Sequence, residues 1–334
     1  MAPLTPRPTV LLVPDCGPGV GIGHLERALA LAETMRPLAS LAMALPPDPV
    51  VEKRVQGRDL APLVLPDSVN ERAGRAASEQ AFAAVILDGY GFDLAVQAEL
   101  RRRAKLVLVD DLSQACDVDL HVNPAPGGET LPRPAGAADA VAGPRFAIMS
   151  PAYAEARRRH AALAAVGPPR VVVATGATDL LGLRATLLGV LEPWAGEVEV
   201  DVVVGSDSEP GVIPGWARSH QDLPDLAGLL AGAALYVGAA GTTAVQAAAV
   251  GVAQVICPVA GNQVAQAEAL RHAGAAAVAE PGAEAAIGAA VNALLEDPAR
   301  RAAMGAAGAR LVDGQGAARV ADLVARLAGV GAAA

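Results

Sequence analysis

This chain of 334 residues has few aromatic residues, few cysteines and no excess of positive charge. Phe, Trp and Tyr make up 2% of it and apolar residues 53%, so a folded core must be built from Ala, Val and Leu. The three cysteines, Cys16, Cys116 and Cys257, are odd in number and lie far apart. This spacing argues against a disulfide framework and a paired-cysteine metal site, and it indicates a reducing cytoplasm.

Charge and hydropathy set further limits. The net charge of −9 leaves no basic stripe for nucleic acid, and we interpret the one basic cluster, residues 157–160, as a solvated helix face. Residues 1–8 hold three prolines and no apolar helix, so we expect no signal peptide. Residues 226–267 carry no charge, but glycines, Pro258 and several amides interrupt them. They predict a buried strand–helix–strand unit with a polar edge, not a membrane span.

Apolar runs alternate with helical patterns through most of the chain, which is typical of parallel sheets covered on both faces. We predict strands at 9–13, 38–44, 62–65, 84–87, 106–109 and 120–122, and a loop over 124–144. The pattern restarts at strand 170–174. We therefore expect an α/β protein with two Rossmann-like domains, residues 1–155 and 165–315, and an active site in the cleft between them. A single doubly wound sheet is the alternative. Residues 316–334 predict a final helix that crosses back to the first domain.

The glycine-rich loop after the first strand is the most informative segment. Glycines at 17, 19, 21 and 23 allow tight turns and close approach of a ligand, and His24 follows at the start of a helix. Open α/β sheets bind ligands at this edge, where a histidine can act as an acid or base. The alternative is that His24 only satisfies the helix start. The alternating glycines do not give the dinucleotide-binding spacing, so we disfavour NAD and expect no cofactor.

A second glycine-rich turn follows the strand predicted at 234–237. Gly238 begins it, and Gly241, Thr242 and Thr243 lead into a helix. Backbone N–H groups, the helix dipole and two hydroxyls can together hold a diphosphate. An ordinary threonine cap explains the same residues equally well.

Two amides follow the next strand, at Asn262 and Gln263, and are expected at the edge of the same sheet. Asn262 can face a sugar there, or it can simply cap the next helix.

Further polar residues follow two strands of the first half. Tyr90 comes after Asp88 at the end of a strand, where a buried structural tyrosine is the simpler interpretation. Asp110 and Asp111 resemble a metal-binding pair, but adjacent strand residues point to opposite faces. We therefore interpret Asp110 or Asp111 as a turn or cap residue and expect no metal site.

Several short motifs occur together in one order from residue 10 to about residue 270. They are G-x-G-H-x-x-R at Gly21–Arg27, D-x-Y at Asp88–Tyr90, D-D-L at Asp110–Leu112, G-P-x-F at Gly143–Phe146, G-x-x-D at Gly176–Asp179, and G-T-T followed by N-Q. As a set they resemble the UDP-2,4-diacetamido-2,4,6-trideoxy-β-L-altropyranose hydrolases of pseudaminic acid biosynthesis. That resemblance implies the GT-B fold and release of UDP from a nucleotide sugar.

The resemblance also implies residue roles. His24 matches the histidine thought to activate water, and Tyr90 and Asn262 match residues that line the same pocket. Gly241, Thr242 and Thr243 match the diphosphate turn, while Gln246 stands where the family usually has a glutamate directed at the ribose. An arginine usual before the first loop is missing, and Val13, Pro14 and Asp15 lie in its region. The expected sugar-binding residues are Asp15, Gly21, Gly23 and Gln263.

The sequence thus predicts a metal-independent, inverting hydrolase, acting as a cytoplasmic monomer on a UDP-activated amino sugar for flagellin or surface glycans. An inverting GT-B glycosyltransferase and a nucleotide-sugar-binding protein without catalysis are the alternatives. Partners other than the sugar nucleotide, such as nucleic acid or membrane, are not expected. His24, Tyr90 and Asn262 argue against loss of catalysis, and Gln246 argues for it.

Overall fold

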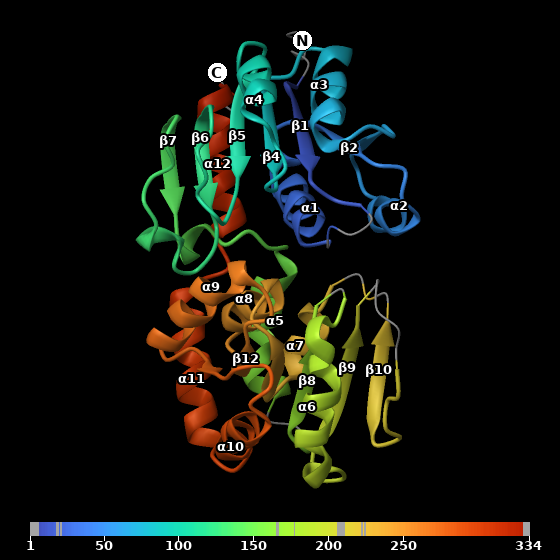
Figure 1. The fold of residues 1–334 in the computed structure, drawn as a ribbon, viewed down its shortest axis with the longest axis vertical. Coiled ribbons are helices and arrows are strands. Elements are labelled where there is room, and N and C mark those ends of the chain that lie inside the picture. The colour runs from blue at the N-terminus through green and yellow to red at the C-terminus, as the bar shows by residue number, and fades with distance from the viewer. Residues whose placement is uncertain are drawn as a thin grey trace, which may run out of the picture. The chain divides into compact units, whose positions relative to one another are not determined.

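The computed structural model describes residues 7–17, 20, 22–164, 167–176, 178–205, 211–221, 223 and 225–329; Gly21 lies outside them. The chain forms two compact α/β units (Figure 1). One unit runs to Ser150 and includes the segment from Gln315 onward, and the other comprises Pro151–Gly314. Each unit has its own parallel sheet, which excludes a single doubly wound sheet.

The first unit contains a seven-stranded parallel sheet with the order β3-β2-β1-β4-β5-β6-β7. The strand order reverses between β1 and β4, so the topological switch point, where such sheets bind ligands, lies at the carboxyl ends of these two strands. The strands are β1 (Thr9–Pro14), β2 (Ser40–Leu45), β3 (Ala61–Val64), β4 (Ala84–Asp88), β5 (Lys105–Val109), β6 (Val118–Asn123) and β7 (Ala137–Ala142).

Helices cover both faces of this sheet. Val10 and Leu12 of β1 pack with α1 and α12 in one core, whereas Leu11 and Val13 pack with α3 in the other. The two cores follow from the alternation of side chains along a strand that is buried on both faces. The helices of this unit are α1 (Gly23–Met35), α2 (Pro49–Val55), α3 (Val69–Glu79), α4 (Leu94–Arg101) and α12 (Gly316–Ala328).

The predicted loop over 124–144 is wrong in part. Gly128–Thr130 form a 3₁₀ turn, and Ala137–Ala142 form the edge strand β7, which pairs with β6. Two positions of this strand are exposed. An edge strand has a neighbouring strand on one side only, so its sequence needs no continuous apolar run.

The second unit contains a six-stranded parallel sheet with the order β10-β9-β8-β11-β12-β13. The order reverses between β8 and β11, so the turn after β11 lies at the switch point of this sheet. The predicted strand at 170–174 is confirmed at these bounds. The strands are β8 (Arg170–Ala174), β9 (Glu199–Val204), β10 (Ala217–Gln221), β11 (Leu235–Ala239), β12 (Ala253–Cys257) and β13 (Ala277–Val278).

Helices α6 and α10 pack against one face of the second sheet, and α7, α8 and α11 also contact its strands. Arg157, Arg158 and Arg159 are exposed on α5, as predicted for a solvated helix face, whereas His160 of the same cluster is half-buried. The helices are α5 (Ala152–Leu163), α6 (Leu183–Leu191), α7 (Ala227–Gly232), α8 (Thr242–Val250), α9 (Gly261–His272), α10 (Glu284–Leu295) and α11 (Pro298–Leu311).

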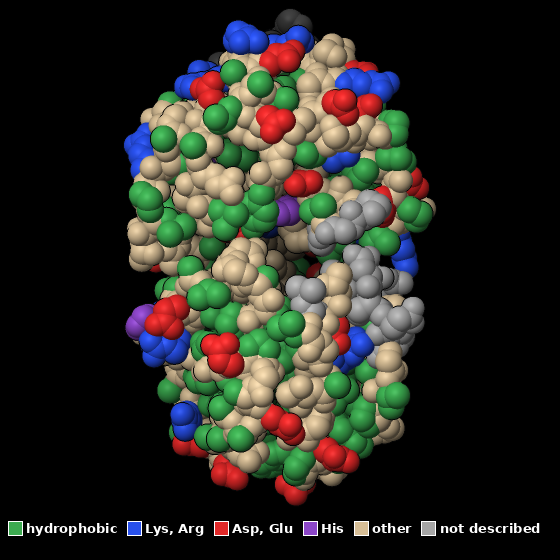
Figure 2. All heavy atoms as spheres, viewed as in Figure 1, with side chains coloured by type: hydrophobic (Ala, Val, Ile, Leu, Met, Phe, Trp, Pro, Cys, Tyr) green, Lys and Arg blue, Asp and Glu red, His purple; other side chains and the backbone are tan. Residues whose placement is uncertain are grey.

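The uncharged stretch from residue 226 forms α7, β11, α8 and β12, confirming the buried strand–helix–strand prediction. Among the described residues no helix is both long and apolar enough to cross a membrane. On the face drawn in Figure 2, Lys and Arg side chains are interspersed with Asp and Glu rather than gathered in one patch.

Candidate functional site

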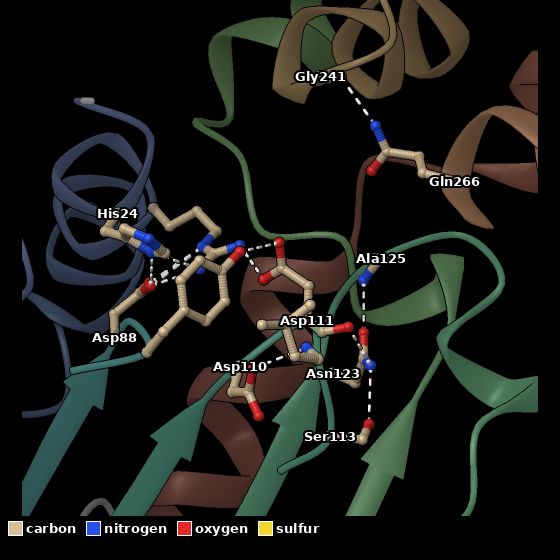
Figure 3. A network of polar contacts seen from close by, with 12 residues as sticks. His24, Asp88, Asp110, Asp111, Ser113, Asn123, Ala125, Gly241 and Gln266 are labelled. Carbon is tan, nitrogen blue, oxygen red and sulfur yellow. Dashed lines mark hydrogen bonds and ion pairs between the residues drawn. The ribbon is translucent and has the colours of Figure 1, made fainter. Parts of the chain in front are cut away.

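A histidine–aspartate pair lies at the switch point of the first sheet (Figure 3). The Nδ1 atom of His24 is 2.8 Å from Oδ1 of Asp88, and the two side chains are 12% and 1% exposed. His24 is the second residue of α1, which follows β1, and Asp88 ends the neighbouring strand β4. The ring contacts Asp88 rather than the helix start, so the geometry does not support the capping interpretation. Nε2 has no hydrogen-bond partner among the described residues.

Arg27 lies one helical turn after His24 and joins two carboxylates. Its Nε donates to Asp88 Oδ2 at 3.1 Å and its Nη2 to Asp88 Oδ1 at 2.5 Å, while Nη1 donates to Asp111 Oδ1 at 2.6 Å. Burial disfavours the charge of this guanidinium, but the two carboxylates outweigh burial and raise its pKa. Arg27 therefore stays charged and fixes Asp88 and Asp111 relative to each other.

Tyr90 connects Asp111 with His24. Its hydroxyl donates to Asp111 Oδ2 at 2.8 Å, and its ring meets the imidazole edge-on, with ring centroids 4.9 Å apart and planes at 85°. Burial opposes ionisation of Asp111, but Arg27 and the Tyr90 hydroxyl together lower the pKa of this carboxyl group. Tyr90 thus packs against the ring of His24, and its hydroxyl proton is donated to the Asp111 carboxylate.

The turn after β5 explains why the two adjacent aspartates differ. Asp110 accepts hydrogen bonds from the backbone N–H groups of Leu112 at 2.7 Å and Gln114 at 2.9 Å, as predicted for a turn residue. Asn123 donates to the carbonyl of Asp111 at 3.0 Å, which leaves the Asp111 side chain directed at Arg27 and Tyr90. The turn interpretation is therefore confirmed by Asp110, whereas the Asp111 side chain bonds to Arg27 and Tyr90.

Asp15 and Cys16 lie beside this cluster at the end of β1. The N–H of Asp15 donates to the carbonyl of Asp88 at 2.8 Å, and its side chain covers the turn that carries Tyr90. A Cβ at Gly89 would lie 2.4 Å from the Cβ of Asp15, so the turn depends on this glycine. Burial raises the pKa of the Cys16 thiol to about 12, so this cysteine is not a nucleophile at neutral pH.

In the second unit, the side chains of Tyr236 and Gln266 fix the turn after β11. Tyr236 of β11 is fully buried, and a Cβ at Gly238 would lie 2.5 Å from its hydroxyl oxygen. Gln266 of α9 donates to the carbonyl of Ala240 at 2.6 Å. It also donates to the carbonyl of Gly241 at 2.9 Å (Figure 3). These contacts direct the two carbonyl groups toward α9 and fix the start of α8.

The first residues of α8 do not cap the helix with their side chains. Gly241 is the N-cap residue and no side-chain hydrogen bond is made there, so the threonine-cap interpretation does not hold. Thr242 is exposed, whereas the Thr243 side chain is hydrogen-bonded to Tyr236. Gln246 is half-buried in the middle of the same helix.

The two amides lie in the first turn of α9. Its N-cap residue is Ala260, so Asn262 is not the cap, and Asn262 is exposed. Gln263 Oε1 accepts from the N–H of Val259 at 3.0 Å, which closes the loop after β12.

Sequence reasoning identified His24 and Tyr90 but not the residues that hold them. Arg27 was part of a motif without an assigned role, although three residues on a helix place it on the same face as His24. Asp88 ends β4 and Asp111 follows the adjacent strand β5, so parallel pairing brings them together. Strand order was the missing information.

No protein-family model and no curated protein matches the sequence. Solved structures do match nearly the whole chain. A calicheamicin glycosyltransferase is 17% identical, with 98% of this chain and 100% of that chain covered and a TM-score of 0.67. The glycotransferase of kitacinnamycin is 16% identical, with 96% and 99% covered and a TM-score of 0.66.

A putative UDP-N-acetylglucosamine 2-epimerase from Listeria monocytogenes is 12% identical, with 96% of each chain covered and a TM-score of 0.65. Identities this low establish the fold alone. The protein therefore has the GT-B fold, built from two Rossmann-like units.

Proposed function

We propose that the protein displaces a nucleoside diphosphate from the anomeric carbon of a nucleotide-activated sugar, with His24 as the general base. The observation that carries the proposal is the contact of His24 Nδ1 with Asp88. A carboxylate at Nδ1 orients the ring and leaves Nε2 to accept a proton from a hydroxyl group.

In the proposed step, the nucleophile's O–H proton moves to Nε2 of His24 while its oxygen attacks the anomeric carbon. The bond from that carbon to the phosphate oxygen breaks, and the diphosphate leaves with the electron pair. Asp88 and Asp111 carry two negative charges against one on Arg27, so the imidazolium that forms neutralises the cluster. Attack opposite to the leaving group inverts the anomeric configuration.

The start of α8 is the proposed binding site for the diphosphate. Gly241 caps this helix without a side-chain hydrogen bond, and Gln266 engages the carbonyls of the turn. The N–H groups of Thr242 and Thr243, the helix dipole and the exposed Thr242 hydroxyl supply donors for an anion. We assign Gln246 to the ribose.

We assign the contacts on the sugar side from the sequence motifs. We assign Asn262 to the sugar because it is an exposed amide in the first turn of α9. Asp15, Gly21 and Gly23 are proposed from the loop that precedes His24. We assign Gln263 to the substrate through Nε2, because its oxygen already accepts from the N–H of Val259.

The identity of the nucleophile separates two candidate functions. Glycosyl transfer to an acceptor hydroxyl is supported by the similar solved structures, most of which are glycosyltransferases by name. Hydrolysis by water is supported by the ordered motifs from Gly21 to Gln263 that resemble UDP-diacetamido-sugar hydrolases. We propose transfer as the first candidate and hydrolysis, as part of pseudaminic-acid-type biosynthesis, as the second.

Release of UDP from a panel of UDP-sugars, measured with and without sugar and aglycone acceptors, tests both. Acceptor-dependent release supports transfer, and equal release in water alone supports hydrolysis. The variant His24→Asn should lose about 10²–10⁴-fold in rate, because asparagine cannot act as a base near neutral pH. His272→Asn, the same change at an exposed histidine, is the matched control. Absence of both UDP release and UDP binding by calorimetry would refute the proposal.

A further inference from the structure

Two groups compete for the same nitrogen of His24. Nδ1 lies 2.8 Å from Asp88 Oδ1 and also 2.8 Å from Nη2 of Arg27. A carboxylate oxygen only accepts a hydrogen bond and a guanidinium nitrogen only donates one. The imidazole can therefore satisfy one neighbour in each neutral tautomer, and never both.

The two tautomers differ in what they can do. With the proton on Nδ1, the ring donates to Asp88 and the lone pair is on Nε2, where a base is needed. With the proton on Nε2, Nδ1 accepts from Arg27 and the base is lost. The choice between Asp88 and Arg27 is thus the choice between an active and an inactive form of the same ring.

We propose that Asp111, acting through Arg27, keeps His24 in the tautomer with the proton on Nδ1. Asp111 holds Nη1 of Arg27 at 2.6 Å, so the positive charge is shared between two carboxylates instead of resting on Asp88 alone. Asp88 then keeps enough negative charge to accept from Nδ1. Asp111 and Arg27 are positioning residues in this scheme, and neither touches the reacting atoms.

The surroundings of Asp111 are built to hold it in place. Tyr90 donates to its second oxygen at 2.8 Å, and Asn123, which is fully buried, donates to its backbone carbonyl. The same Tyr90 ring packs edge-on against the imidazole, so rotation of His24 away from Asp88 is opposed. The cluster therefore fixes both the direction of the ring and the side that carries its proton.

Removal of the Asp111 charge has a defined consequence. In Asp111→Asn the guanidinium of Arg27 has Asp88 as its one remaining carboxylate partner among the described residues. The positive potential at Nδ1 rises, which favours a lone pair on that atom and a proton on Nε2. The ratio of the Nδ1–H to the Nε2–H form should fall by about tenfold or more, the scale of one charge-assisted hydrogen bond.

Nitrogen-15 NMR of histidine-labelled protein measures this ratio without substrate, with His24 assigned by its loss in His24→Asn. We expect mainly Nδ1–H in the wild type at high pH and a shift to Nε2–H in Asp111→Asn. The double variant Arg27→Met/Asp111→Asn should return to Nδ1–H, because the competing donor is gone. Asp139→Asn, which removes an exposed carboxylate of the same unit, is the control.

An unchanged ratio in Asp111→Asn, or a wild type that is mainly Nε2–H, would overturn the inference. If Asp111→Asn does not fold, Asp111→Glu keeps the charge but displaces it by one methylene, and it should shift the ratio in the same direction. The catalytic role of the Nδ1–H tautomer of His24 rests on the proposed function. A shifted tautomer without activity in the wild type would refute that function alone, whereas an active wild type with no shift would refute this inference alone.

Discussion

Asp88 Oδ1 lies 2.8 Å from His24 Nδ1 although the two residues are 64 positions apart in the chain. The contact arises because β1 and β4 are adjacent parallel strands with Pro14 in register with Asp88. A short loop separates β1 from helix α1. The first turn of α1 places His24 beside the end of β4. The strand order therefore brings the pair together, at the point where the order of strands in a doubly wound sheet reverses.

Asp88→Asn should reduce the rate of UDP release by about 10²–10⁴-fold, because His24 loses the carboxylate that orients it and stabilises its charged form. UDP affinity should change little, since the proposed diphosphate site belongs to the other unit. Steady-state kinetics and calorimetry measure the two quantities. Asp139→Asn serves again as control, and equal rates for Asp88→Asn and the wild type would remove the pair from the mechanism.

The two threonines of the α8 turn should behave differently. Thr242→Val should weaken UDP binding by about 1.5–3 kcal/mol, the value of a hydrogen bond to a charged oxygen. Thr243→Val should change UDP affinity less and lower the melting temperature, because this hydroxyl is bonded to buried Tyr236. Calorimetry and thermal unfolding separate the two effects. A loss of affinity confined to Thr243→Val would show that our assignment is reversed.

Buried strands were predictable from the sequence, whereas the edge strands β7 and β10 were not. Strands β8 and β12 have apolar side chains on both faces and end where the apolar runs end. By contrast β10, with the sequence ARSHQ, carries polar side chains because it lies at a sheet edge. This segment is a strand because it pairs with β9. The sequence pattern of the segment itself gives no sign of that pairing.

The site shows the same division. Glycine spacing and motif order pointed to His24 and Tyr90, which depend on local context. Asp111 lies 84 positions from Arg27, and their ion pair exists only because β5 lies beside β4 in the sheet. The sequence alone did not distinguish Asp111 from its neighbour Asp110, which is the turn residue.

Gly316 should tolerate no side chain, unlike Gly74. A Cβ at Gly316, the first residue of α12, would lie 2.2 Å from the carbonyl oxygen of Ala147. Gly316→Ala should therefore destabilise the protein by about 1–3 kcal/mol through overpacking. Gly74 is helical with nothing within 4 Å of its Cβ position, and Gly74→Ala should stabilise by about 0.4–1 kcal/mol. Urea unfolding of both variants tests the pair, and equal shifts would contradict it.

His160 should make the protein less stable below neutral pH. Burial lowers the pKa of this histidine below its usual 6.5, although its ring is hydrogen-bonded to the carbonyl of Ala231 at 3.2 Å. As the pH falls through 6.5, the unfolded chain takes up a proton that the folded chain resists. The free energy of unfolding therefore decreases in that range, and it is restored as the pH rises above 6.5.

Urea unfolding at pH 7.5 and 5.5 tests this with His160→Gln, whose amide can still donate to the Ala231 carbonyl but does not titrate. The difference between the two pH values should be smaller in the variant than in the wild type. Every other titrating group is common to both proteins, so the comparison isolates His160. His272→Gln, at an exposed position of α9, should keep the wild-type difference. An equal pH dependence in His160→Gln and the wild type would mean that burial does not oppose protonation of this ring.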